Sequence, residues 1–258
     1  MQITKTILKT WKTFLKHKKL IPMPVISDLI FYFLLSWLTI HTTYKLTAIA
    51  ETIMTTFGEL ANIIGTDIMQ NAQIIEQYKQ VSQTMLIFIA ATLALWMIFK
   101  GINWYYAHLM TGKTPKTKEF IVSFFTKTII WFLISLAVIF IAGFINYKIL
   151  ISQSNISGPE TTFTISIILI WIISYFGLIA YSLNTTKYIK TTFKAGIKQW
   201  KQTIPAYLLS TITIILSIII FYNIFIRNFY ISIIILILII LPAIQYMRML
   251  TIESIKKR

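Results

Sequence analysis

The chain contains no cysteine, and its eight glycines are scattered through 258 residues. Without thiols, the protein has no disulfide, no thiolate catalysis and no cysteine-ligated zinc. Acidic residues are scarce too, with 8 Asp and Glu against 24 Lys and Arg. No Gly-rich loop could hold a phosphate, and no serine lies in a nucleophile-elbow motif. The sequence therefore predicts no cofactor and no enzymatic activity.

Three histidines are the remaining candidates for metal ligands. His17, His41 and His108 lie in different connections or span ends, on both sides of the predicted membrane. A metal site needs several ligands around one point. We therefore expect no shared metal site.

Apolar residues make up 57% of the chain, and charged residues only 12%. A soluble protein of this length could not bury so much apolar surface, so the expected solvent is lipid. The apolar runs predict an all-α polytopic membrane protein of one domain, residues 1–258, with about six spans arranged as three hairpins. The predicted spans are residues 25–44, 85–105, 120–147, 162–183, 204–226 and 229–247.

The basic residues are sorted between these runs. Most basic residues fall at the N-terminus, in the second-to-third and fourth-to-fifth connections, and at the C-terminus, where we count Arg248 with the last three residues. Most acids fall in the other connections. Basic loops stay on the cytoplasmic side, so both termini are expected to be cytoplasmic in a plasma-membrane protein. The net charge of +16 is then explained by the basic residues that keep these connections in the cytoplasm, and nucleic-acid binding is not expected.

Two basic segments have helical amphipathic patterns. Residues 1–20 and residues 187–202 each place apolar side chains on one face and lysines on the other. Such helices lie along headgroups, with their lysines toward anionic lipid. Each helix could be a topology anchor only, or a docking site for a partner or specific lipid. The candidate headgroup contacts are Lys5, Lys9, Trp11, Lys12, Lys16, Lys190, Lys194, Lys198 and Trp200.

The two basic segments also resemble each other. KTFLKHKKLIP, from Lys12 to Pro22, aligns with KAGIKQWKQTIP, from Lys194 to Pro205, when one residue is inserted. With the basic connection at 112–118, this suggests a threefold repeat of hairpins, although topology alone would enforce much of the similarity. The order of basic amphipathic helix, proline and apolar span resembles six-span prokaryotic membrane proteins similar to the membrane domain of some glycerophosphodiester phosphodiesterases. The soluble catalytic barrel of that enzyme is absent, so the resemblance implies a non-catalytic membrane module.

The outer connection, residues 46–83, carries a narrow apolar stripe at helical spacing. The stripe predicts that the first two spans continue beyond the bilayer as an antiparallel helical hairpin. The alternative is a helix lying flat on the outer leaflet. An exposed stripe of this kind could contact a protein partner or a second copy of the chain. The candidate contact residues are Ile53, Phe57, Leu60 and Ile64.

Apart from Lys100, which we count with the basic second-to-third connection, two charges lie within predicted spans. Asp28 and Lys127 both enter from the cytoplasmic side at similar depth. Because a charge at such depth needs compensation, we expect an Asp28–Lys127 ion pair between packed helices. Lys127 could instead snorkel to headgroups, or both residues could belong to a conduction or substrate site. The sequence as a whole predicts a scaffold or accessory module without chemistry of its own. The alternative is a transport component for a small solute or lipid.

Overall fold

The computed structural model describes residues 2–61, 72–113, 115–152, 159–183 and 188–255, and these residues form helices with no strand among them. The predicted helical class is confirmed. Within the described residues, five segments are long and apolar enough to cross a membrane, which fits a multi-pass membrane protein. The five segments are Lys18–Gly58, Ile74–Met110, Thr117–Ile141, Trp200–Arg227 and Phe229–Ile255.

The fourth predicted span, residues 162–183, falls in helix α6, Pro159–Ser182. Its described apolar stretch, Ile167–Ser182, is shorter than the other five.

The chain groups into two compact units, although the sequence predicted one domain. We call Ser27–Lys100 the long-helix unit, and Met1–Ile26 with Gly101–Arg258 the bundle unit. The chain passes between the units within α2 (Pro22–Ala61) and directly before α4 (Gly101–Met110).

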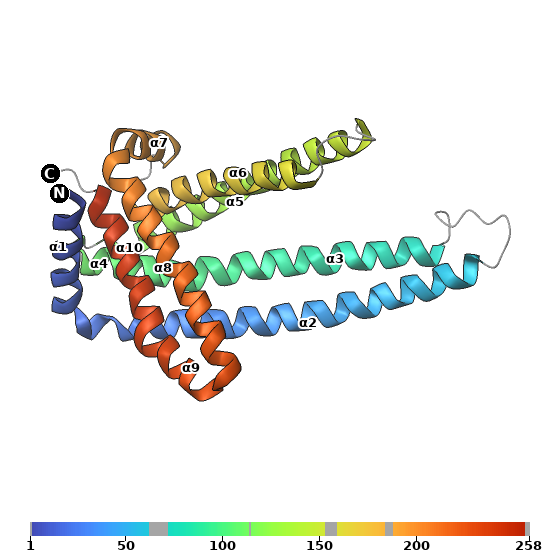
Figure 1. Ribbon diagram of the computed structural model, residues 1–258, viewed down its shortest axis with the longest axis horizontal. Coiled ribbons are helices and arrows are strands. Elements are labelled where there is room, and N and C mark those ends of the chain that lie inside the picture. Colours follow the sequence, from blue (N-terminus) through green and yellow to red (C-terminus); the bar gives the residue numbers. More distant parts are fainter. Residues whose placement is uncertain (1, 62–71, 114, 153–158, 184–187, 256–258) are drawn as a thin grey trace. The chain divides into compact units, whose positions relative to one another are not determined.

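The long-helix unit consists of the greater part of α2, then α3 (Ala72–Leu95) and a π-helical turn, Trp96–Lys100. Pro22 and Pro24 stand in the first turn of α2, where a proline's missing N–H breaks no helical hydrogen bond. From there α2 runs without interruption through the segment that the sequence assigned to the first span and the start of the outer connection (Figure 1).

Burial along the two long helices recurs every three or four residues, as expected for helices that bury one stripe each. On α2 the buried or half-buried positions include Phe31, Leu35, Leu38, Thr42, Leu46, Ile49 and Ile53. On α3 they include Ile74, Gln77, Val81, Thr84, Phe88 and Ala91. The stripe that was predicted from sequence on residues 46–57 is therefore the inward face of α2.

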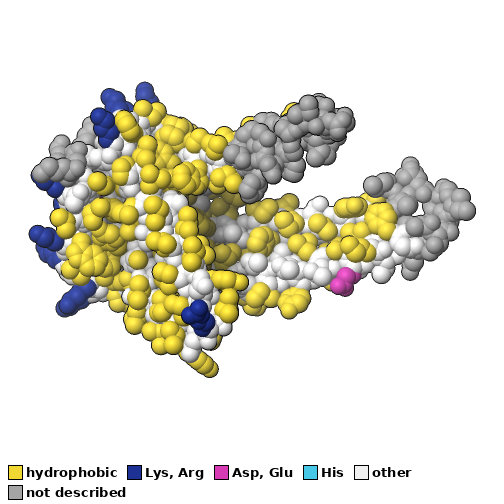
Figure 2. All heavy atoms as spheres, in the orientation of Figure 1, with side chains coloured by type: hydrophobic (Ala, Val, Ile, Leu, Met, Phe, Trp, Pro, Cys, Tyr) yellow, Lys and Arg dark blue, Asp and Glu magenta, His cyan; other side chains and the backbone are white. Residues whose placement is uncertain are grey.

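Among the described residues, seven helices follow the long-helix unit: α4, α5 (Thr117–Ser152), α6, α7 (Tyr188–Lys198), α8 (Trp200–Arg227), α9 (Phe229–Ile235) and α10 (Leu241–Ile255). They form the bundle unit together with α1 (Gln2–Lys16). A second π-helical turn, Leu236–Ile240, joins α9 to α10. Apolar side chains cover much of the visible surface of this unit, as expected for helices that face lipid (Figure 2).

Two connections show why the chain turns where it does. Gly112 adopts a φ of +74°, and the amides of Gly112 and Lys113 bond the carbonyls of Leu109 and His108. This is a Schellman motif, which ends α4 and needs glycine at that position. At the other connection, the Asn228 side chain accepts a hydrogen bond from the Ile231 amide and caps α9 only one residue after α8 ends.

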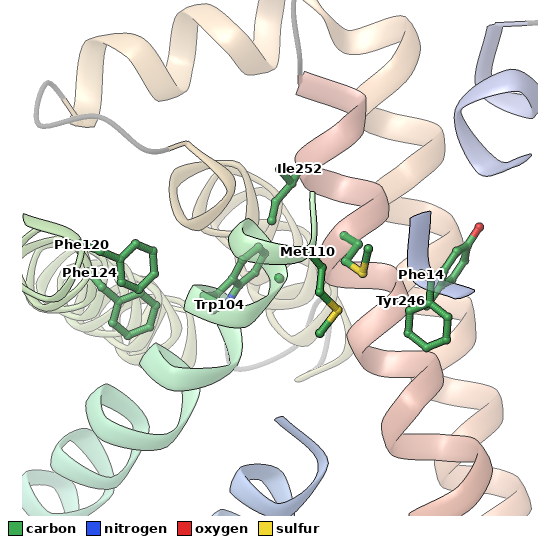
Figure 3. Packing of buried hydrophobic residues seen from close by; sticks show 9 residues of the cluster. Phe14, Trp104, Met110, Phe120, Phe124, Tyr246 and Ile252 are labelled. Atoms are coloured by element: carbon green, nitrogen blue, oxygen red, sulfur yellow. The ribbon is translucent and has the colours of Figure 1, made fainter. Parts of the chain in front are cut away.

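Helix α10 is the centre of the bundle unit, packed against α1, α4, α6 and α8. Figure 3 shows the apolar cluster around it, which contains Phe14, Trp104, Met110, Phe120, Phe124, Tyr246 and Ile252. The sequence placed the end of the last span near Met247 and counted Arg248 among the C-terminal charges. Helix α10 continues to Ile255, and Arg248 is buried with its guanidinium 2.9 Å from the Gln245 Oε1 atom.

Candidate functional site

The strongest candidate site is a buried ion pair in the long-helix unit. The Lys100 amino group lies 2.5 Å from a carboxylate oxygen of Asp28, and both side chains are almost fully buried. One residue away, the Ser27 hydroxyl donates to the Phe99 carbonyl at 3.0 Å. These contacts join the start of the unit to its end and set α2 against α3 in an antiparallel register.

Aromatic rings surround the Lys100 ammonium. Its nitrogen lies 4.0 Å from the ring centroid of Phe31, 4.3 Å from that of Tyr32 and 5.9 Å from that of Trp96. A cation over ring faces is attracted by the ring quadrupole, more strongly where water is excluded. The rings therefore stabilise a buried charge that the carboxylate neutralises. We call these five residues the caged ion pair.

The π-helical turn Trp96–Lys100 positions the lysine. Leu95, Met97 and Phe99 are half-buried and Lys100 is buried. A π turn holds more residues per turn than a regular α-helix, so it shifts the side chains that follow relative to the inward face. Lys100 ends this turn, with its amino group at the carboxylate of Asp28.

Sequence reasoning missed Lys100 as a partner because it assigned this lysine to a cytoplasmic connection. The signal was available: Asp28 and Lys100 lie near the predicted cytoplasmic ends of consecutive predicted spans, which puts them at one predicted depth. Lys127 is buried in the bundle unit, where its amino group donates to the carbonyl oxygen of Leu183, just past the end of α6. A cation is favourable at a helix C-terminus. The expected Asp28–Lys127 pair joins residues of different units and stays a prediction.

The predicted N-terminal amphipathic helix is docked on the bundle. The Lys9 amino group lies 2.8 Å from a Glu253 carboxylate oxygen, and the Tyr246 hydroxyl donates to the Ile7 carbonyl at 3.1 Å. The rings of Trp11 and Tyr246 meet edge to face, with centroids 5.7 Å apart. Residues far apart in the sequence thereby fasten α1 to α10.

The second amphipathic helix, α7, is docked as well. The Tyr175 hydroxyl of α6 donates to the Gly196 carbonyl at 2.9 Å. The rings of Phe176 and Phe193 lie 4.5 Å apart between centroids. Trp200, which the sequence assigned to this amphipathic segment, is the first residue of α8.

The candidate headgroup contacts lie on these two helices and at the start of α8. Lys5, Lys12, Lys16, Lys190, Lys194 and Lys198 are exposed, and Lys9 is exposed despite its ion pair. Trp11 and Trp200 are about half exposed. On the face that Figure 2 shows, most Lys and Arg side chains of the bundle unit gather at the end where α1 and α7 lie. This arrangement is compatible with contact to anionic headgroups.

The candidate partner residues are placed less favourably. Ile53 and Phe57 are half-buried on the inward stripe of α2. Leu60 lies in α2 with a side chain that is not described, and Ile64 lies outside the described residues. The exposed face of this part of α2 instead carries Tyr44, Glu51 and Met54.

The histidines are spread over the two units. His108 is buried in the bundle unit, with Nε2 3.0 Å from the Tyr181 carbonyl oxygen, and His17 is half-buried at the end of α1. His41 stacks on Trp37 in the long-helix unit. Within the described part of the chain, no group of three or more His, Cys, Asp or Glu residues could hold a metal ion.

No family model, curated protein or solved structure matches this chain. The resemblance to the membrane domain of glycerophosphodiester phosphodiesterases therefore stays a prediction.

Proposed function

We propose that the protein is a membrane-embedded scaffold or accessory module that holds a rigid two-helix arm outside the bilayer for a partner protein. The observation that carries this proposal is the length of the long helices. At the helical rise, the 40 residues of α2 extend about 60 Å, twice the roughly 30 Å of a hydrocarbon core. Even a tilt of about 40° lengthens the path through the core only to about 39 Å. A large part of α2 is left outside.

The exposed side chains indicate where the long helices leave the lipid. On α2 the exposed surface carries Ile30, Phe33, Trp37 and Ile40. Beyond Thr42 it becomes mixed, with Lys45, Thr47, Glu51 and Thr52 beside exposed Tyr44 and Met54. On α3 it changes in the same way at Thr84, from Leu86 and Ile87 to Gln83, Ser82 and Lys79 beside exposed Tyr78 and Ile75. From Met23 to Thr42 the helix rises about 29 Å, close to the core thickness.

The register of the two helices supports one common boundary. The contacts of Asp28 with Lys100 and of Phe31 with Trp96 set residue 42 of α2 at the height of residue 85 or 86 of α3. The continuous exposed apolar surface thus gives way to a mixed one within about one turn of the same height on both helices, and the nearby Thr42 and Thr84 are both buried. We call the part beyond this layer, from residue 43 of α2 to residue 83 of α3, the outer arm.

The proposed topology has six spans in three hairpins, with both termini on the cytoplasmic side of the plasma membrane. The lysine asymmetry of the connections supports this orientation. α6 provides the fourth span, and α1 and α7 lie at the cytoplasmic interface. Exposed Glu51 and Glu76 then belong to the outer arm, where acids are tolerated.

The bonding of the intramembrane charges favours a scaffold over the transport alternative. Transport sites use polar groups that meet a substrate or a water path. Here Asp28 and Lys100 bond each other inside the ring cage, and Lys127 bonds the carbonyl at the end of α6. These groups hold helices in place.

A photoactivatable amino acid at Met54, which is 74% exposed on the proposed outer arm, tests the proposal in intact cells. We expect a discrete cross-linked protein from this position. The matched control carries the same probe at Phe33, which is 72% exposed but lies in the apolar part of α2 and should cross-link mainly to lipid. Protein cross-links from neither Met54 nor Tyr78, in a protein that inserts normally, would reduce the arm to a spacer.

A further inference from the structure

The amphipathic helix α1 has three faces. The docked face contains Thr10 and Phe14, which are buried, and half-buried Ile7. A second face is apolar yet exposed, with Leu8 at 57%, Trp11 at 48% and Leu15 at 50%. The third face carries the exposed lysines 5, 12 and 16, together with Lys9. The apolar face predicted from sequence is thus split, and only part of it packs on the protein.

Helix α7 is divided in the same way. Its docked face contains Thr192 and Gly196, where an added Cβ would lie 2.7 Å from a ring carbon of Phe176. Ile189, Phe193 and Ile197 are 50%, 40% and 64% exposed on a second face, which Trp200 continues. The third face carries Lys190, Lys194 and Lys198. The protein therefore leaves two surfaces of each helix uncovered, one apolar and one cationic.

We propose that α1 and α7 form a fixed collar that binds anionic phospholipid headgroups at the cytoplasmic surface. In this collar the exposed apolar face of each helix is buried at the boundary between headgroups and acyl chains, and its lysine face contacts the lipid phosphates. Anionic phospholipid fits both exposed faces. A helix that faced only water would not expose Leu and Trp, and a helix buried in the membrane core would not carry several lysines. The described residues of the two helices include no acid. The collar rests on the proposed topology, which puts both helices on the cytoplasmic side.

The order of the faces supports a collar made of equivalent elements. At 100° per residue, the exposed apolar face of α1 follows the docked face by about 100°, and the lysine face follows by about 100° more. In α7 the faces follow in the same direction, at intervals of about 80° and about 100°. Two interfacial helices with this common order run around the bundle in the same sense. They are related by rotation about the membrane normal, as in parallel repeats.

Spin labels can test how the collar lies in the membrane, because the native chain has no thiol. Single cysteines at Leu8, Leu15 and Ile197 report on the exposed apolar faces, and cysteines at Lys12, Lys16 and Lys194 on the lysine faces. The full-length protein is placed in vesicles of equimolar phosphatidylcholine and phosphatidylglycerol. We expect the first group to be relaxed by oxygen and shielded from a water-soluble nickel complex, and the second group to show the reverse. Equal nickel access in both groups would overturn the collar.

Lipid selectivity is tested with three charge reversals of equal size. Lys12→Glu with Lys16→Glu alters α1, Lys194→Glu with Lys198→Glu alters α7, and Lys45→Glu with Lys79→Glu is the control on the outer arm. The measured quantity is the preference of the protein for spin-labelled phosphatidylglycerol over spin-labelled phosphatidylcholine. We expect each of the first two variants to lower this preference about fivefold or more. The control should retain it.

Wild-type preference in both collar variants would overturn the proposal. If a charge reversal prevents folding, the spin-label depths still test the proposal, because three of those labels leave every lysine intact and each of the other three replaces a single lysine. Thiol labelling of Glu51→Cys from outside the cell tests the topology separately. If Glu51→Cys is labelled from outside the cell but the two groups of spin labels show equal depth, only the collar is refuted. If Glu51→Cys is labelled only from the cytoplasmic side, the topology on which the collar rests is refuted.

Discussion

Asp28 and Lys100 form an ion pair inside the long-helix unit, 2.5 Å apart and covered by the rings of Phe31, Tyr32 and Trp96. A buried pair contributes little over an apolar replacement, but the loss of one partner leaves an uncompensated charge. We therefore expect Asp28→Asn to lower the stability of the detergent-solubilised protein by about 3–5 kcal/mol. The double variant Asp28→Asn with Lys100→Met should recover part of that loss, measured as melting temperatures in one detergent.

The double variant Asp28→Asn with Lys127→Met tests whether Lys127 also pairs with Asp28. If Lys100 alone compensates Asp28, the stability losses from Asp28→Asn and Lys127→Met should add. If Lys127 also shares the carboxylate, as the sequence predicted, this second double variant will be more stable than the sum of its single changes. Strict additivity in the cycle with Lys100→Met would refute the caged ion pair.

The helical class could be predicted from the sequence because apolar runs and lysine-rich connections follow from solvent and topology alone. The inward stripe at Leu46, Ile49 and Ile53 followed from periodicity. Periodicity could not identify Lys100 as the partner of Asp28, because Lys100 ends a π-helical turn and a regular helical spacing does not hold through such a turn. The burial of Arg248, in the middle of α10, could not be predicted for a related reason, because it depends on how the helices of the bundle unit pack around α10 and no local pattern encodes that.

Gly196 and Gly177 offer a matched pair of substitutions. A Cβ at Gly196 would lie 2.7 Å from a Phe176 ring carbon and 3.0 Å from the Ile179 Cδ1 atom, whereas a Cβ at Gly177 would meet nothing within 4 Å. Gly196→Ala should destabilise the bundle unit by about 1–3 kcal/mol through overpacking. Gly177→Ala should be neutral or stabilise it by about 0.5–1 kcal/mol, because alanine favours a helix. Thermal unfolding distinguishes the two, and equal shifts of one sign would argue against the docking of α7 on α6.

The ion pair of Lys9 with Glu253 should keep α1 docked. The Glu253 side chain is 3% exposed, so Lys9→Met leaves a buried carboxylate without this cation and costs about 1–3 kcal/mol. Thr10, which is fully buried, reports the change. A cysteine at position 10 should react with a water-soluble thiol reagent faster in the Lys9→Met background. Lys12→Met, which removes an exposed lysine of the same helix, is the control and should leave the rate unchanged.

The register of the long helices predicts which positions of α2 and α3 face each other. Thr42 and Thr84 are both buried, and the register that the contacts of Asp28 and Phe31 set places them within about one turn of the same height. Tyr44 is 75% exposed on the other side of α2. In a chain without other thiols, cysteines at 42 and 84 should be joined rapidly by a short bifunctional thiol reagent. Cysteines at 44 and 84 should be joined slowly, although they lie at almost the same height. Equal rates for the two pairs would mean that α2 has another face toward α3, and the common membrane boundary inferred from this layer would then lose its support.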